Sequence, residues 1–153
     1  WCRAACEDDM SGFSNYAANQ ILECYFRRSA GISVPSALYL SLHTGNPGAD
    51  GTANVTTYTG YARVRIVNVT NFLAGTTVVQ SDAAGRKLIN GASVQFPTVA
   101  GAGFTATHVG IWDALSGGNF IAAVDLTASL TYAVGDIPIV NTSNLTLIQA
   151  TQI

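Results

Sequence analysis

The feature that most constrains the fold is a change at Pro35 from a helical apolar pattern to an alternating one. In Ala37–Thr44, leucines alternate with Tyr, Ser and His, which is the period of a half-buried strand. Glycine-, asparagine- and proline-rich turn signals follow at short intervals, without intervening helical patterns. Further strands are predicted at Tyr61–Val69, Thr77–Gln80, Lys87–Ile89, Ser93–Phe96, Ala106–Trp112, Phe120–Leu126, Ser129–Val134, Ile137–Val140 and Leu145–Gln149. This succession predicts a mainly β protein, an antiparallel β-sandwich or jelly-roll-like single domain.

One amphipathic helix is predicted before the first strand, and it carries apolar residues at helical spacing, namely Ala18, Ile21, Leu22, Tyr25 and Phe26. Ser14 is the expected N-cap, and Gly31 suits the C′ position. The spacing predicts that the aromatic residues of this helix belong to the core. We expect residues 10–153 to form the domain, with Met10 as a natural start, and residues 1–9 to form an extension or arm.

The charge content narrows the classes of partner. Only 7 basic and 9 acidic residues are present, 10% of the chain, against about 25% in a typical soluble domain. A monomer with so few charges would be poorly soluble, so we expect a homo-oligomer or an assembly component. The basic residues are too sparse to bind nucleic acid, and no apolar run approaches the roughly 18–20 residues that span a membrane.

No catalytic or metal-binding constellation is recognisable. His43 and His108 are expected to be ordinary polar strand residues, and the spacing from His108 to Asp113 places them on opposite faces of a regular strand. A Gly-x-Ser-x-Gly elbow is absent, and Asp113 is expected to hold the Ser116–Gly118 turn through its amide hydrogens. The cysteines, Cys2, Cys6 and Cys24, form no disulfide framework or metal-ligand pattern. We therefore expect no enzyme activity, cofactor or metal.

Several segments, in this order and approximate spacing, resemble a family of small structural proteins of tailed phages. They are Ala37–Pro47, Tyr61-Ala62-Arg63, Val94-Gln95-Phe96-Pro97 and His108–Ala114 followed by Ser116-Gly117-Gly118-Asn119. The resemblance extends over about residues 12–149, and it departs from the family at Phe104, where a tryptophan is expected. Members of that family are often labelled tail fibre proteins, and some are similar to trimeric cement or decoration proteins of the capsid. The resemblance therefore implies a virion protein.

Two virion functions follow as alternatives, beside the remoter one of a secreted lectin-like domain that has no role in a virion. The first is a capsid cement protein, a homotrimer that bridges subunits of the major capsid protein. The second is a tail-associated spike or fibre module that binds a host surface glycan through Tyr39, Tyr58, Tyr61 and Trp112. The long polar segment Gly45–Gly60 is expected to be a surface loop that contacts a partner protein. The candidate protein-contact residues are Asn46, Pro47, Asp50, Thr52, Tyr58, Arg27 and Arg28.

Overall fold

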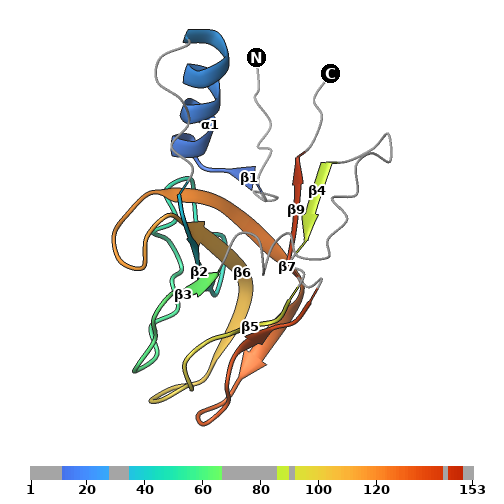
Figure 1. Ribbon diagram of the computed structural model, residues 1–153. Helices are drawn as coiled ribbons and strands as arrows, with labels where there is room; N and C mark the ends of the chain where they lie inside the picture. Colours follow the sequence, from blue (N-terminus) through green and yellow to red (C-terminus); the bar gives the residue numbers. More distant parts are fainter. Residues whose placement is uncertain (1–11, 28–34, 67–85, 90–91, 143–144, 150–153) are drawn as a thin grey trace, which may run out of the picture.

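The computed structural model describes residues 12–27, 35–66, 86–89, 92–142 and 145–149, and its architecture is shown in Figure 1. One helix and a set of antiparallel strands form a mainly β, single-domain fold consistent with a β-sandwich, as the sequence predicts. The elements are β1 (Gly12–Phe13), α1 (Asn15–Leu22), the π-helical turn η1 (Glu23–Arg27), β2 (Leu38–His43), β3 (Val64–Ile66), β4 (Arg86–Ile89), β5 (Val94–Gln95), β6 (Phe104–Trp112), β7 (Phe120–Tyr132), β8 (Ile139–Val140) and β9 (Thr146–Gln149). The predicted strand Thr77–Gln80 lies outside the described residues.

The largest sheet has five strands in the order β1-β7-β6-β2-β3, all paired antiparallel. Its centre is the long hairpin of β6 and β7, whose connecting loop spans residues 113–119. Two smaller sheets, β4-β9 and β5-β8, complete the described fold. The main core joins the five-stranded sheet to the β5-β8 pair. Its buried residues are Leu40, Leu42, Ile66, Val94, Phe96, Ala106, Val109, Ile111, Ala122, Val124, Leu126, Val140 and Leu145.

A smaller cluster of Trp112, Phe120 and Ala123, with Tyr39 packed against it, is separate from the main core. Phe120 and Ala122 would share a face in a regular strand, yet they belong to different clusters. The register between β6 and β7 shifts at this point, because Ile111 pairs with Ala122 while Trp112 pairs with Phe120. Such a bulge re-aims the side chains beyond it, and here it brings Phe120 to Trp112. Their ring centroids are 5.0 Å apart.

Two expectations about strands need correction. β2 is not half-buried, because Ser41 and His43 are as inaccessible as Leu40 and Leu42. The segment Gly45–Gly60 folds back over this polar face, and Thr56 N–H donates to the Leu42 carbonyl at 3.0 Å. The predicted strands on either side of Thr127 are one strand, β7, because its pairing with β6 continues beyond the core.

The helix begins where the sequence predicts. Ser14 is the N-cap of α1, since its Oγ accepts a hydrogen bond from Ala17 N–H at 3.1 Å. The same hydroxyl donates to the Phe120 carbonyl, and Ser14 N–H donates to the Ile121 carbonyl at 2.8 Å. These bonds attach the first turn of the helix to β7. Beyond that turn, α1 and η1 extend away from the sheets (Figure 1).

Candidate functional site

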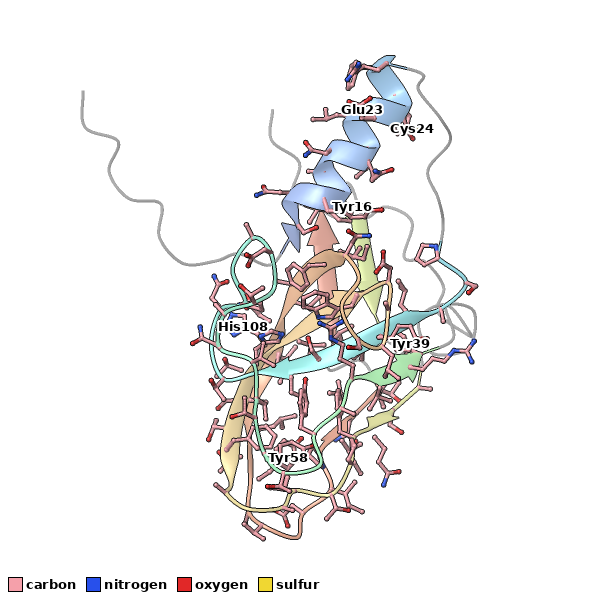
Figure 2. The ribbon with its side chains drawn as sticks, turned by 90° about the vertical axis from the view of Figure 1, so that its left-hand side faces the viewer. Tyr16, Glu23, Cys24, Tyr39, Tyr58 and His108 are labelled. Atoms are coloured by element: carbon pink, nitrogen blue, oxygen red, sulfur yellow. The ribbon has the colours of Figure 1, made fainter. Side chains whose placement is uncertain are left out.

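The apolar face of the helix is exposed. Leu22, Tyr25 and Phe26 have 53%, 75% and 79% of their surface accessible, whereas in α1 and η1 only Ala17 is buried. Figure 2 shows why: Tyr16 lies beside the sandwich, whereas Glu23 and Cys24 lie at the far end of the helix. The expectation that the aromatic residues of this helix belong to the core is therefore wrong for the isolated chain. Large exposed apolar groups gathered on one element are typical of an interaction surface.

The segment Gly45–Gly60 is braced by its own side chains. The Asn46 side chain accepts a hydrogen bond from Gly48 N–H at 2.8 Å, and the Asn54 side chain donates to the Asn46 carbonyl at 2.8 Å. Asp50 accepts from both the backbone N–H and the hydroxyl of Thr52, at 3.1 and 2.8 Å. The Thr52 hydroxyl is the main cause of a lowered pKa of the Asp50 carboxyl. Asp50 is therefore an ionised acceptor at neutral pH.

The tip of this loop touches the aromatic pair on the sheet. A Cβ atom at Gly51 would overlap the Phe120 ring and lie 2.7 Å from the Trp112 ring, and Gly51 has a φ of +73°. Only glycine fits both the approach and the backbone conformation. The loop is therefore seated on Phe120 and Trp112 and forms one wall of the site.

A buried chain of hydrogen bonds joins the same loop to Trp112. The Trp112 indole N–H donates to Ser41 Oγ at 2.9 Å, Ser41 Oγ lies 2.7 Å from His43 Nε2, and His43 Nδ1 lies 2.9 Å from the Ala53 carbonyl. Burial lowers the pKa of His43 to about 4, so the imidazole is neutral at pH 7. A carbonyl only accepts, so we assign the proton of His43 to Nδ1. Nε2 then accepts from the Ser41 hydroxyl, and every partner in the chain is satisfied.

Arg63 holds the opposite wall. Its guanidinium carbon lies 3.5 Å from the centre of the Trp112 ring, in a cation–π contact. One guanidinium nitrogen donates to the carbonyls of Ala114 and Gly117, at 3.0 and 2.7 Å. Asp113 braces the same loop from within, because it accepts from the backbone and side-chain nitrogens of Asn119 at 2.6 and 2.7 Å. Asp113 thus holds the hairpin loop as predicted, although through Asn119 and not through Ser116–Gly118.

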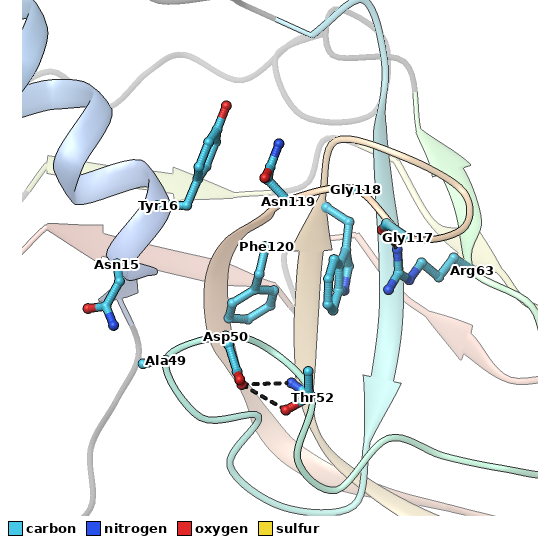
Figure 3. A pocket seen from close by; sticks show the side chains of 11 residues that line it. Asn15, Tyr16, Ala49, Asp50, Thr52, Arg63, Gly117, Gly118, Asn119 and Phe120 are labelled. Atoms are coloured by element: carbon cyan, nitrogen blue, oxygen red, sulfur yellow. Dashed lines mark hydrogen bonds between the residues drawn. The ribbon is translucent and has the colours of Figure 1, made fainter.

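These walls enclose a pocket of about 480 Å³ (Figure 3). Its lining is an aromatic floor, the tip of the 45–60 loop, the 113–119 loop, Arg63 and the first residues of α1. The lining residues are Asn15, Tyr16, Ala49, Asp50, Thr52, Arg63, Trp112, Gly117, Gly118, Asn119 and Phe120. Loops, strands and a helix that are distant in sequence therefore meet at one concave surface.

The predicted contact residues are only partly brought together. Asp50 and Thr52 are exposed and line the pocket, and Asn46 is half-buried within the loop. Pro47 and Tyr58 are buried, which argues against a direct contact by either side chain. Tyr58 instead stacks on Phe104, with ring centroids 5.2 Å apart, and donates to the Pro97 carbonyl at 2.8 Å.

The predicted basic pair of the helix is also only partly placed. Arg27 is exposed at the end of η1 and forms an ion pair with Glu23 at 2.7 Å. Arg28 lies outside the described residues.

Several contributors to the pocket were not predicted as contacts, namely Arg63, Gly117, Gly118, Asn119 and Phe120. Arg63 belongs to a segment that carried the family resemblance but no prediction of a site, and Phe120 reaches the pocket through the register shift at the start of β7. Of the aromatic residues predicted to stack on a glycan, only Trp112 lines this pocket, and it does so as part of a largely buried floor.

The remaining candidate side chains lie as follows. His108 Nε2 lies 2.7 Å from Asp125 Oδ1, across the β6–β7 pair. Among the described residues, no three His, Cys, Asp or Glu side chains gather to hold a metal ion, and Cys24 is a free thiol. No helix of the described ranges is long and apolar enough to cross a membrane.

Comparison with known families gives one finding. A model of the family described as Podophage GP4 fiber I protein gp80 matches residues 12–148. The chain belongs to this family. The match begins at β1 and ends within β9, so it includes the helix, both walls of the pocket and the β6–β7 hairpin. Membership makes the chain a structural protein of a tailed-phage virion, as its resemblance implied. No curated protein matches the chain.

Proposed function

We propose that the protein is a building block of a fibre on the virion, which acts by assembly and not by catalysis. The description of its family, which names a fibre protein, is the observation that carries this proposal. The sequence alone favoured capsid cement over a fibre, and the family description favours the fibre. No step of the proposed role uses a cofactor or a metal.

The exposed helix face supports assembly. Leu22, Tyr25 and Phe26 lie on a segment that projects from the sandwich, where a neighbouring subunit has access to it. A closed homo-oligomer, a trimer being the expected state, would bury these side chains against their copies or against an adjacent sheet. The low charge of the chain agrees with this, since surface that is buried in an assembly does not require charge for solubility.

Capsid cement is the second candidate function, in which the partner is the major capsid protein. The compact sandwich favours it, because the described residues contain neither a long shaft nor a second domain. A cement protein would stabilise the shell by binding assembled capsid and not free subunits.

The position and copy number of the protein in purified virions distinguish the two functions. Cryo-electron microscopy is expected to find a small number of copies, grouped by symmetry in a fibre. Hundreds of copies at local threefold positions of the shell would contradict the fibre and establish the cement function.

A further inference from the structure

We propose that an apolar surface around β8 receives the helix of a second copy of the chain, in a head-to-tail contact. The receiving surface, called the distal face, consists of Val134, Ile137 and Ile139. The docking surface, called the helix face, consists of Leu22, Tyr25 and Phe26. This inference rests on the proposed function, which requires contact between copies, and it names the surface that meets the helix.

The distal face is apolar and open. Val134, Ile137 and Ile139 are 60%, 43% and 37% exposed. Pro138 and Val140, which alternate with the two isoleucines, are buried. Successive side chains of an extended segment point to opposite sides, so the two isoleucines share the outer side of this segment. The chain therefore presents aliphatic side chains to the outside where it could have placed polar ones.

The two faces lie at opposite ends of the molecule. Among the described residues, eight large apolar side chains are strongly exposed, and six of them form these two faces. The other two, Phe13 and Leu115, are single, as exposed apolar residues of soluble proteins commonly are. The helix lies at one end of the molecule, and the turn between β7 and β8 lies at the other (Figure 1). Copies stacked in one orientation therefore bring the helix face of one to the distal face of the next.

The symmetry of an assembly favours a second copy as the occupant. A contact between two identical surfaces stops at a dimer, whereas a single contact that builds a larger ring or a fibre joins two different surfaces of each copy. The helix face is one such surface, and the distal face is the second. A head-to-tail contact closes into a ring, such as the expected trimer, or continues as a fibre.

The charges beside the two faces favour an apolar contact between them. On the helix, Glu23 and Arg27 pair with each other at 2.7 Å. Asp136 is the one charged residue in the segment 127–142, and its Oδ2 accepts a hydrogen bond from Ala133 N–H at 2.7 Å. Docking would therefore place aromatic rings against aliphatic side chains, and each of these charged groups would keep its present partner.

The distal face is ordered before a partner arrives. Phe96 N–H donates to the Pro138 carbonyl at 2.8 Å, which ties the segment to the chain beyond β5. The Tyr132 hydroxyl donates to the Ile139 carbonyl at 3.2 Å, which ties it to the end of β7. A surface whose backbone is already held in place loses less entropy on binding.

A mixing experiment with full-length chains tests the contact. Val134→Ser combined with Ile137→Ser removes apolar groups of the distal face, and Tyr25→Ala combined with Phe26→Ala removes those of the helix face. Each double variant alone is expected to self-associate at least tenfold more weakly than the wild type in sedimentation velocity. An equimolar mixture of the two is expected to form a one-to-one complex, because each variant keeps the surface that the other has lost.

Three results would overturn the proposal. They are a wild-type chain that stays monomeric, a distal-face variant that associates as the wild type does, and a mixture that forms no complex. The second result would mean that the helix face binds its own copy, and the third that the two faces bind different partners. Failure of the fibre function is seen separately, because the position of the protein in the virion decides it.

Leu115→Ser is the matched control. Leu115 is 55% exposed on the 113–119 loop, outside both faces, so the same kind of change is expected to leave association unchanged. Equal weakening by this variant would contradict the distal face. Circular dichroism checks that each variant is folded, and Val134→Ser alone, at the most exposed position of the distal face, replaces the double variant if that one does not fold.

Discussion

At the scale of the residue, His43 is the clearest case of a side chain whose role depends on burial. It has no accessible surface, and its ring joins Ser41 to the Ala53 carbonyl. In the assigned tautomer the neutral imidazole accepts from Ser41 and donates to Ala53, and protonation would place a charge in a site that has no access to water. Because burial lowers the pKa of His43 to about 4, the ring becomes charged only well below neutral pH.

We predict that His43 makes folding stability fall between about pH 6.5 and 4. The folded pKa is depressed below the ordinary value of 6.5, so in this window the unfolded chain binds a proton that the folded chain does not. Stability from this group is therefore complete at pH 7 and decreases on acidification, by about 3 kcal/mol at most. Urea unfolding of wild type and His43→Gln at pH 7, 5.5 and 4 measures the effect, and the difference in unfolding free energy should shrink by up to that amount.

His43→Gln controls for the carboxylates, because these groups titrate in both the wild type and the variant between pH 7 and 4. His108 and Arg63, the charged neighbours that also lower the pKa of His43, are likewise retained in both. A difference that stays constant from pH 7 to 4 would contradict the prediction. If the variant does not fold, the imidazole proton resonance of wild type provides the check, since it should not shift between pH 7 and 5.

At the scale of the element, the packing of the 45–60 loop depends on the bulge in β7. The bulge brings Phe120 onto the face of Trp112, and the loop then seats Gly51 on both rings. The length and polar composition of the loop predicted only a surface that contacts a partner protein. The outer residues of the loop still offer such surface, but its tip is part of the fold.

We predict that Gly51→Ala is strongly destabilising, by about 2–5 kcal/mol. A methyl group would overlap Phe120 and Trp112, and the positive φ adds strain to any side chain. Gly60→Ala is the matched control, since Gly60 has a φ of +84° but nothing within 4 Å of the point where a Cβ atom would lie. Gly60→Ala should lower the free energy of unfolding only by the cost of a positive φ in a residue with a side chain, about 1–2 kcal/mol. Urea unfolding compares the two, and equal losses would show that the loop tip does not press on the rings.

At the scale of the whole molecule, the sandwich has a complete core and the helix does not. Every large side chain of the main core is buried within the chain, whereas the apolar face of α1 and η1 has no cover from the described residues. Helices this short are marginal without tertiary packing. A neighbouring subunit would supply that packing, which ties the stability of the helix to assembly.

We predict that Tyr25→Ala combined with Phe26→Ala reduces self-association at least tenfold while the sandwich stays folded. The two side chains are 75% and 79% exposed, so the monomer loses little when they are removed, whereas an interface loses two aromatic anchors. Sedimentation velocity across a concentration series measures the association, and Gln20→Ala on the same helix is the control. An oligomer that resists the double variant would place the interface elsewhere.

Local pattern in the sequence was enough to predict the elements that depend on a few neighbouring positions. The alternation in β2, the Ser14 cap and the turn residues around Asp113 act over such short distances, so the strands, the helix start and the braced hairpin loop were predictable. The ordered motifs were sufficient to indicate a phage virion protein, which the family match confirms.

Which surfaces are buried and which are exposed depends on the tertiary structure. Burial of Ser41 and His43 depends on a loop that folds over them, and the place of Phe120 depends on the register shift at the start of β7. The exposure of Phe26 depends on the direction in which the helix leaves the sheet. Each of these is set by contacts between residues far apart in sequence, for which local periodicity carries no signal. The pocket is formed by segments that are distant in sequence, and for that reason no single motif predicted it.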